Sequence, residues 1–563
     1  MSRPPFSCPG LRSASRSTPK RRPLPSPSDP LGRALGGTSR VVAVDVCALR
    51  RGLGPLAGPD LCWEDLGLAH WLLDPGGGKR SLAQLVERWA PHLWPLLPQG
   101  QDSGSTAAAK SCVLALHLQQ PIMAALQEAQ LSTIFAELEM PALGVLCKMD
   151  CNGLGYSEEA RVLEALHSAL GRLQARCTSL AGRQLALHSP RDVSQAVRRR
   201  LAHLAEARGL LSTSSRPLTK AQLESLAALD PLPRLVLDWR KVHAVLNGSL
   251  VPAARSGVPC PELGMVRVHP RSEPHSATGR VSLREPNLQA VARDFEVALD
   301  PPVTLNPRRA FVPFQGALLL SADYSQLELR LLAHLSADEA LVAVFSQGGD
   351  VFAQMAARWG HQTTRHRAKQ ICYGIVYGRG PRSLAEELGM EVAEADRMMA
   401  DFRLAFPGLQ RYANQLVSQA RSLGHVRTVL GRRRPLPQLR SADAAVRARA
   451  ERQALSTAVQ GSAADLLKSA LVAVDAALAH RFPHSRHPLS TPGCGHPSSG
   501  AFLVLQLHDE LLLEVCARDL PTVAALVAER MRTALRLRVP LAVRLRAGPS
   551  WGQLEDYSPG SAA

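Results

Sequence analysis

The sequence predicts an α/β protein of several domains, and three observations support this prediction. First, the chain has 563 residues, which is too many for one hydrophobic core, and 45% of them are hydrophobic. Second, the periodicity of apolar residues indicates helices through most of 140–250 and again through 350–440. Third, short apolar runs at 318–320 and 503–515 are typical of buried strands.

Apolar periodicity and capping residues predict the elements of the first half. Residues 40–49 indicate a strand, and residues 65–73 and 108–131 indicate helices. A long amphipathic helix is expected after Ser157, its N-cap, and a shorter one after Thr219.

Two segments are not typical of regular structure. Residues 1–40 are rich in Ser, Pro and Arg, which predicts a disordered basic tail. A mitochondrial transit peptide is the alternative, although the prolines would break its amphipathic helix. Residues 481–500 are rich in Pro, Gly, Ser and His and indicate a flexible loop. The alternative for this loop is a zinc site, although the spacing of its possible ligands fits no standard site: His484, His487, Cys494 and His496.

The charge balance predicts a polyanionic partner. The chain has 66 Lys and Arg against 48 Asp and Glu, a net charge of +18, and its pI is near 10.0. Such an excess favours nucleic acid as the partner. A charge that serves only solubility, together with a basic tail, is the alternative.

Cysteine usage and hydropathy bear on the compartment. The 11 cysteines are scattered singly without a Cys-x-x-Cys pair, which favours reduced thiols in a nuclear or cytosolic setting. The expected compartment is the nucleus, with the mitochondrion as the alternative on the basis of the N-terminal segment. No apolar run approaches the roughly 18 residues that a membrane span needs, so no membrane partner is expected.

Acidic residues stand at the ends of the two apolar runs. Asp323 follows the first run, and His508, Asp509 and Glu510 interrupt the second. A hairpin turn explains the triplet equally well when it is taken alone. Carboxylates at strand ends in an apolar sheet are unfavourable unless they hold cations. If folding brings the two aspartates together, they could bridge two Mg²⁺ ions about 3.5–4 Å apart, a site for phosphoryl transfer.

A helical stripe lies between these acids in the sequence. Arg365, Lys369, Tyr373 and Tyr377 recur every fourth residue and so share one slowly drifting face of a helix. Two cations followed by two aromatic rings suit a triphosphate at one end and a base at the other. The alternative is a solvated basic turn that runs into a buried aromatic turn.

These segments resemble the family A DNA polymerases. DYSQLELR, RHRAKQICYGIVYG and QLHDE look like motifs A, B and C of that family, in its order, and the likeness covers roughly residues 60–560. Within the family the nearest likeness is to theta-type enzymes, on AKQICYGIVYG, EPNLQAVARDFEV, LGLAHWLLDP and LQLHDELL, and nu-type enzymes are the alternative. Four further segments carry the general resemblance: 275–289, 430–437, 450–468 and 549–557.

The resemblance implies a right-hand polymerase fold with palm, fingers and thumb, preceded by a degenerate 3′–5′ exonuclease-like domain of the RNase H-like type. The boundaries that it implies are an inactive exonuclease-like domain at 41–139, a thumb at 140–265, fingers at 346–440, and a palm formed by 266–345 and 441–563.

The resemblance also assigns the catalytic residues. Asp323 and Asp509, with the backbone carbonyl of Tyr324, would hold two Mg²⁺ ions, for which Mn²⁺ could substitute. Glu510 would support them beside the primer end. Lys369 would donate a proton to the leaving pyrophosphate.

The nucleotide site is implied in the same way. Arg365 and Lys369 would grip the phosphates of the incoming dNTP. Glu328 would be a steric gate that leaves no room for a 2′-hydroxyl. Tyr373 would stack near the sugar, where its hydroxyl could replace the missing 3′-hydroxyl of a dideoxynucleotide, and Tyr377 would stack beside the templating base.

The resemblance assigns a further group of side chains to the DNA. They would contact the minor groove, where acceptors are common to all base pairs, and the primer strand. They are Arg280, Asn287, Gln289, Arg293, Arg452, Gln460 and His508.

Several features depart from the family pattern. Ser456 stands where relatives carry Asn, so modestly altered fidelity is expected. The Asp45-Val46-Cys47 segment lacks the Glu of an exonuclease Asp-x-Glu motif, and His70 to Asp74 has the spacing of a His variant without partners. The first two theta-type insertions are short, at 205–215 and 298–311, which puts the holding of poorly paired ends and lesion bypass in doubt. No Walker A pattern occurs, so no helicase motor is expected and we interpret the chain as a fragment, an isoform or an incomplete product.

The expected function is template-directed addition of dNTPs to a primer 3′-hydroxyl, with primer–template DNA and dNTPs as partners. The implied setting is double-strand-break repair by microhomology-mediated end joining, or translesion synthesis. The alternatives are a nu-type translesion or crosslink-repair polymerase, a non-catalytic DNA-bridging protein, and a single-subunit RNA polymerase. Glu328 argues against the last, and the intact Asp323, Asp509 and Lys369 argue against bridging alone. The oligomeric state is not predicted.

Overall fold

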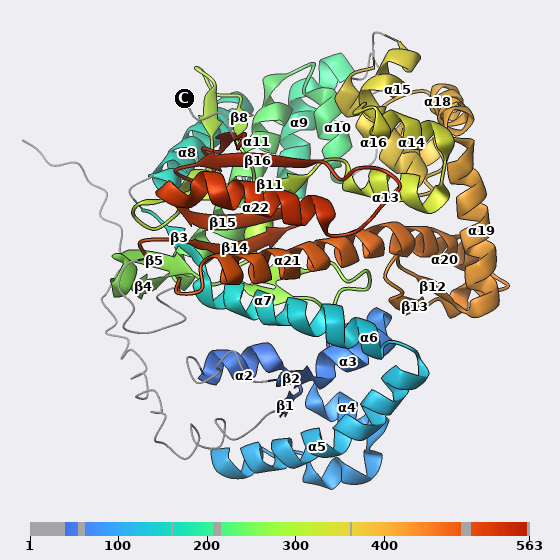
Figure 1. The fold of residues 1–563 in the computed structure, drawn as a ribbon. Helices are drawn as coiled ribbons and strands as arrows, with labels where there is room; N and C mark the ends of the chain where they lie inside the picture. The colour runs from blue at the N-terminus through green and yellow to red at the C-terminus, as the bar shows by residue number, and fades with distance from the viewer. Residues whose placement is uncertain are drawn as a thin grey trace, which may run out of the picture.

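The computed structural model describes residues 40–53, 62–158, 161–205, 216–360, 363–485 and 497–559. The predicted basic tail, most of the first short insertion and most of the His/Cys loop, including His487, Cys494 and His496, lie outside these residues. Figure 1 shows a small N-terminal region below a larger body of helices around a central sheet. No helix among the described residues is long and apolar enough to cross a membrane.

The central sheet carries the acidic motifs. It has five antiparallel strands in the order β14-β15-β11-β16-β17. Their bounds are β14 (Ala501–Leu507), β15 (Glu510–Cys516), β11 (Ala317–Tyr324), β16 (Val543–Gly548) and β17 (Glu555–Asp556). Both predicted apolar runs therefore belong to one sheet. The run at 318–320 is the middle of the longer strand β11, and the run at 503–515 forms the hairpin of β14 and β15.

Both faces of this sheet are buried, which explains the near-continuous apolar sequence of β14 and β15. On one face, residues such as Leu320 and Leu511 pack against α21 (Ser462–Arg481) and α22 (Leu520–Thr533). On the other face, residues such as Leu319 and Leu512 join a core shared with the helical region 154–310. Strands that are covered on both sides lose the usual polar alternation, and Figure 1 shows the two helices lying across the strands.

The helical region between 140 and 265 confirms most of the expected helices. Its helices are α7 (Met140–Asn152), α8 (Val162–Ala181), α9 (Pro190–Ala205), α10 (Lys220–Leu226), α11 (Pro231–Val245), the π-helix η6 (Leu246–Leu250) and α12 (Val251–Ser256). Thr219 caps α10 through a capping box with Gln222, as predicted.

The prediction that Ser157 caps the long helix is wrong. Helix α8 begins at Val162, and the position before it is Arg161 with φ of 47° and no side-chain cap. Ser157 instead extends the preceding strand, because its backbone N–H donates to the carbonyl of Ala310 at 2.8 Å. Ser157 is therefore part of the strand pairing and lies too far before α8 to cap it.

Short strands connect this region to the central sheet. A four-stranded sheet has the order β10-β3-β5-β4, and two further pairs are β6-β7 and β8-β9. Their bounds are β3 (Leu154–Tyr156), β4 (Val258–Cys260), β5 (Met265–Val268), β6 (Arg271–Glu273), β7 (Ser282–Arg284), β8 (Phe295–Val297), β9 (Val303–Leu305) and β10 (Phe311–Val312).

Residues 327–456 are helical, as the periodicity predicts, apart from one hairpin. The helices are α13 (Leu327–Ser336), α14 (Glu339–Ser346), α15 (Val351–Trp359), α16 (Arg365–Val376), α17 (Pro381–Leu388), α18 (Val392–Ala405), α19 (Pro407–Leu423) and α20 (Ala444–Ser456). The hairpin, which the periodicity did not reveal, pairs β12 (His425–Arg427) with β13 (Arg433–Pro435). Figure 1 shows these helices gathered at one end of the sheet.

The N-terminal region is mixed, as expected. It contains a parallel pair of β1 (Arg40–Ala43) and β2 (Cys62–Asp65), followed by α3 (Leu66–Leu73), α4 (Leu82–Trp89) and α5 (Gly104–Glu128). The strand predicted over 40–49 ends at Ala43, and α2 (Val46–Leu53) occupies its second half.

The expectation of reduced thiols is wrong for one pair of cysteines. Cys47 on α2 and Cys147 on α7 form a disulfide, with their Cα atoms 5.5 Å apart. The two cysteines are 100 residues apart in the sequence, so no local pattern indicates that they pair. Only the packing of α2 on α7 brings the two thiols together.

Candidate active site

Asp323 and Asp509 lie side by side where two inner strands of the central sheet end. Asp323 is the penultimate residue of β11 and pairs with Glu510, the first residue of β15. The backbone N–H of Tyr324 donates to the carbonyl of Asp509 at 3.1 Å. The hairpin that joins β14 to β15 has only two residues in its turn, His508 and Asp509. The structure thus brings together two acids that are 186 positions apart, and it confirms both the turn and the convergence.

The surroundings of these acids disfavour negative charge. Partial burial and the nearby Glu510 raise the pKa of Asp323 from 3.8 to about 6. Partial burial, Glu328 and Asp323 raise the pKa of Asp509 to about 6 as well. Arginines oppose both shifts without cancelling them. The negative charge of the carboxylates at this site exceeds the positive charge of the neighbouring side chains. Such a site is stabilised when it binds cations.

The donor set fits Mg²⁺. Among the described residues no group of three or more His, Cys, Asp or Glu side chains is arranged to hold a metal. Mg²⁺ is commonly bound through one or two carboxylates and completes its shell with water and substrate phosphates. The carboxylates of Asp323 and Asp509, with the carbonyl of Tyr324, match that kind of partial shell.

Glu510 is held in place by two groups that sequence reasoning missed. The hydroxyl of Ser321 donates a hydrogen bond to its Oε1, and Arg546 Nη2 lies 3.5 Å from the same atom. Ser321 and Arg546 lie opposite one another on β11 and β16. Alternation along β11 could have placed Ser321 near Asp323, but only the strand register reveals Arg546.

Glu328 forms the centre of a second hydrogen-bonded group. It lies in the first turn of α13, one turn after the sheet edge, and is 9% exposed. Arg280 Nη2 and the hydroxyl of Tyr377 both donate to its carboxylate. Burial and the nearby Glu328 carboxylate raise the pKa of Tyr377, so this phenol stays protonated and able to donate. The side chain is therefore fixed at its position rather than free in solvent.

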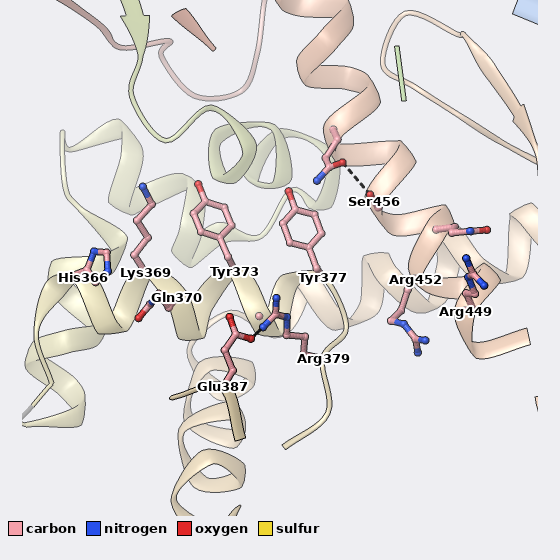
Figure 2. A pocket seen from close by; sticks show the side chains of 13 residues that line it. His366, Lys369, Gln370, Tyr373, Tyr377, Arg379, Glu387, Arg449, Arg452 and Ser456 are labelled. Carbon is pink, nitrogen blue, oxygen red and sulfur yellow. Dashed lines mark hydrogen bonds and ion pairs between the residues drawn. The ribbon is translucent and has the colours of Figure 1, made fainter. Parts of the chain in front are cut away.

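The predicted stripe on α16 faces a cavity of 810 Å³. Figure 2 shows Lys369, Tyr373 and Tyr377 in a row along this helix, pointing to the same side. The rings of Tyr373 and Tyr377 are nearly parallel, with centroids 6.2 Å apart, and Lys369 Nζ lies 6.0 Å from the Tyr373 ring. Such a volume lies within the range of pockets that take small molecules of nucleotide size.

Arg365, the first residue of the stripe, is placed differently. Its guanidinium pairs with Asp350, the N-cap of α15, at 2.6 Å, and it does not line the cavity. Binding a phosphate would therefore require Arg365 to exchange or share this partner.

Apart from Arg280, which holds Glu328, the residues assigned to DNA contacts divide into three groups. Arg452 and Gln460 line the cavity from the helices opposite α16, and Ser456 donates to Gln460 at 3.2 Å. Arg293 and His508 are exposed beside the acids.

Asn287 and Gln289 belong to the third group, because both form hydrogen bonds within their own segment. Asn287 accepts from the Gln289 N–H at 3.0 Å, and Gln289 Nε2 donates to Val281 O at 3.0 Å. Their contacts with DNA stay predictions.

The cavity also has a wall that sequence reasoning did not include. Six further side chains line it, and they lie on α16, on α20 and near α17. A helical spacing from Lys369 or Arg452 would have found several of them: His366, Gln370, Arg379, Glu387, Arg449 and Gln453.

The remnants of an exonuclease motif are occupied by other contacts. Asp45 pairs with Lys79 at 2.7 Å, and Asp74 with Arg80 at 3.5 Å. His70 is buried, and its Nδ1 accepts a hydrogen bond from Trp89 Nε1. Burial lowers the pKa of His70 to about 4, so the ring is neutral. Among the described residues, these side chains form no group of three or more that could hold a metal ion.

Comparisons with known proteins agree with this geometry. The chain is 32% identical to DNA polymerase theta of Mus musculus over 88% of this chain and 24% of that protein. It is 35% identical to the thermostable DNA polymerase I of Thermus filiformis over 85% of this chain and 55% of that protein. The chain thus spans about a quarter of the length of the theta relatives and about half that of the bacterial ones.

A solved structure gives the fold. The polymerase domain of Pol1 from M. smegmatis, in complex with DNA primer–template and dNTP, superposes with a TM-score of 0.71 at 28% identity, covering 87% of this chain and 82% of that chain. The right-hand fold with a degenerate exonuclease-like N-terminal domain is thereby confirmed. The profile described as DNA polymerase family A matches residues 157–553, and this chain belongs to that family.

Proposed function

We propose that the chain is a DNA-directed DNA polymerase that adds dNTPs to the 3′-hydroxyl of a primer annealed to a template. The observation that carries the proposal is the convergence of Asp323 and Asp509 at the strand ends of a buried sheet, next to a cavity lined by Lys369 and two stacked tyrosines. Family membership and the relatives named as DNA polymerases support it.

The acids supply the metal site of the proposed reaction. Two Mg²⁺ ions held by Asp323, Asp509 and the Tyr324 carbonyl would activate the attacking 3′-hydroxyl and stabilise charge on the leaving pyrophosphate. Glu510, fixed by Ser321 and Arg546, adds negative charge beside them without being free to move.

The cavity residues would bind and select the nucleotide. Lys369 reaches the phosphates and supplies the proton that the leaving group takes up. The tyrosine rings offer apolar faces for the sugar and the neighbouring base. Glu328 is held rigidly by Arg280 and Tyr377, so a 2′-hydroxyl beside it would meet a fixed carboxylate rather than a mobile one.

The remaining assigned residues would hold the primer–template. Arg452 and Gln460 line the cavity next to the position proposed for the nascent pair, and Arg280 and His508 flank the acids. Contacts of this kind to minor-groove acceptors test the shape of a base pair without reading its sequence.

Primer extension tests the proposal directly. Purified protein with Mg²⁺ should extend a gapped substrate, chelation should stop extension, and Mg²⁺ or Mn²⁺ should restore it. Asp323→Ala and Asp509→Ala should each abolish extension. Glu555→Ala, an exposed acid on the edge strand of the same sheet, should leave it unchanged. Extension by the Asp323→Ala/Asp509→Ala double variant would overturn the proposal.

We infer a setting in nuclear DNA repair of the theta type, by end joining or translesion synthesis. The theta relatives, which match along 88% of the chain, support this inference. The test compares synapsis and extension of 3′ overhangs that share a few paired bases with filling of a gap. Efficient gap filling without joining of overhangs would refute the end-joining role, and a block at template lesions would refute the translesion role.

A further inference from the structure

One of the contacts between the N-terminal region and the polymerase body is made by a buried tryptophan. Trp71 on α3 is 0% exposed, and its Nε1 donates to the backbone carbonyl of Ser276 at 3.1 Å. Ser276 begins the 276–280 turn, which ends at Arg280. The proposed mechanism assigns no role to any residue of the N-terminal region, although this hydrogen bond reaches a segment of the active site.

The 276–280 turn is held from a second side by Arg432, which lies in the β12–β13 hairpin. Arg432 Nη2 donates to the carbonyl of Thr278 at 2.8 Å. Gly279 has φ of +82°, and a Cβ at this position would lie 2.4 Å from the Arg432 guanidinium. The guanidinium therefore packs directly on the turn, which only glycine permits.

Trp71 and Arg432 belong to one buried cluster. The Trp71 ring lies 5.5 Å from the Arg432 guanidinium and 5.1 Å from Lys468 Nζ, as in cation–π contacts. Asp465 neutralises Arg432 at 2.7 Å, and Glu139 neutralises Lys468 at 2.6 Å. All five residues are at most 1% exposed, so the cluster has little freedom to rearrange.

The turn connects the buried cluster to Glu328, because Arg280 at its end binds the Glu328 carboxylate. The Gly279 N–H donates to Ser276 O at 3.0 Å, and Ser276 Oγ donates to Arg280 O at 2.7 Å, which closes the turn on itself. The Arg280 side chain in turn holds Glu328. The path from Trp71 to Glu328 therefore consists of hydrogen bonds and one five-residue turn.

We propose that Trp71 is a positioning residue for sugar selection: through the 276–280 turn and Arg280 it fixes the carboxylate of Glu328. The degenerate exonuclease-like region thus helps to hold the side chains of the polymerase site in position. This inference rests on the proposed function, since it assigns a role in selecting the nucleotide that the polymerase adds.

The test variant is Trp71→Phe, which keeps an aromatic ring in the cluster and removes the donor to Ser276 together with part of the indole. The matched control is Trp89→Phe, because Trp89 Nε1 donates to His70 at 3.2 Å within the N-terminal region and does not touch the turn. Both variants lose one indole hydrogen bond in the same region, so a general loss of stability affects both.

The ratio of kcat/KM for a dNTP to that for the matching rNTP is the first measurement. We expect Trp71→Phe to lower this ratio about fivefold, the factor that one typical hydrogen bond represents. The change should come mainly from a lower KM for the rNTP, because a mobile Glu328 carboxylate can move aside for the 2′-hydroxyl. Trp89→Phe should leave the ratio unchanged. In a Glu328→Ala background, Trp71→Phe should have no further effect on the ratio, because its action passes through Glu328.

Hydrogen exchange of the 276–280 turn is the second measurement, and it does not depend on activity. Faster exchange of the Gly279 amide in Trp71→Phe than in Trp89→Phe is expected. An unchanged ratio in Trp71→Phe, an equal change in Trp89→Phe, or an additive effect in the Glu328→Ala background would overturn the inference while the proposed function stands. Wild-type protein that extends no primer would overturn the proposed function and this inference with it.

Discussion

Replacing Asp509 by Asn should stabilise the metal-free protein while it abolishes primer extension. Burial, Glu328 and Asp323 raise the pKa of Asp509 from 3.8 to about 6. The folded state therefore holds the Asp509 proton more tightly than the unfolded state does. As pH rises from about 4 to about 6, the wild-type protein loses free energy of unfolding, and the loss is complete above pH 6.

The size of this effect follows from the shift. A pKa change from 3.8 to about 6 lowers the free energy of unfolding by roughly 3 kcal/mol at pH 8, and by less than about 1 kcal/mol at pH 4. Asn has the shape of Asp without its charge, and it is well tolerated in a two-residue turn. Asp509→Asn should therefore exceed the wild type in stability by up to about 3 kcal/mol at pH 8.

Urea denaturation in the presence of a chelator at pH 4 and pH 8 measures the difference. Glu555→Gln, on the exposed edge strand, is the control and should match the wild type at both pH values. Added Mg²⁺ should narrow the gap at pH 8, since it stabilises only the protein that retains the carboxylate. If Asp509→Asn is no more stable than the wild type at pH 8, the electrostatic account of this site is refuted.

Three further predictions concern the nucleotide site and the DNA. Glu328→Ala should lower dNTP over rNTP discrimination by at least about tenfold in single-nucleotide kinetics, since the gate and the partner of Arg280 are both lost; an unchanged ratio would contradict the gate. Tyr373→Phe should raise discrimination against a dideoxynucleotide about tenfold in competition with the dNTP, and equal terminator use by both proteins would show that the hydroxyl plays no part. Raising salt from 50 to 200 mM should weaken primer–template binding by about a thousandfold, in line with the net charge of +18, and an affinity independent of salt would show that phosphate contacts do not dominate.

The acids and the stripe could be found in the sequence because each is a local pattern. Asp323 follows one apolar run, the Asp509 turn interrupts another, and the α16 stripe has a strict helical spacing, so each could be recognised without the fold. The roles assigned to these residues come from the family resemblance and stay predictions. The structure adds the pairing of β11 with β15, which places the two acids together.

Features that depend on packing between distant segments could not be predicted from periodicity. Arg546 reaches Glu510 only because β16 pairs with β11, and Cys47 meets Cys147 only because α2 packs on α7. Trp71 has the appearance of an ordinary core residue of an apolar helix. Its role depends on the carbonyl that its indole N–H meets, which lies 205 positions away.

Metal binding by single variants tests the central claim most directly. Mn²⁺ titration followed by electron paramagnetic resonance, with a dideoxy-terminated primer–template and dNTP present, should show two tightly bound ions in the wild type and in Glu555→Gln. Asp323→Asn and Asp509→Asn should each lose that binding, because both carboxylates serve one shared site. Wild-type affinity in either variant would contradict the convergence on which the account rests.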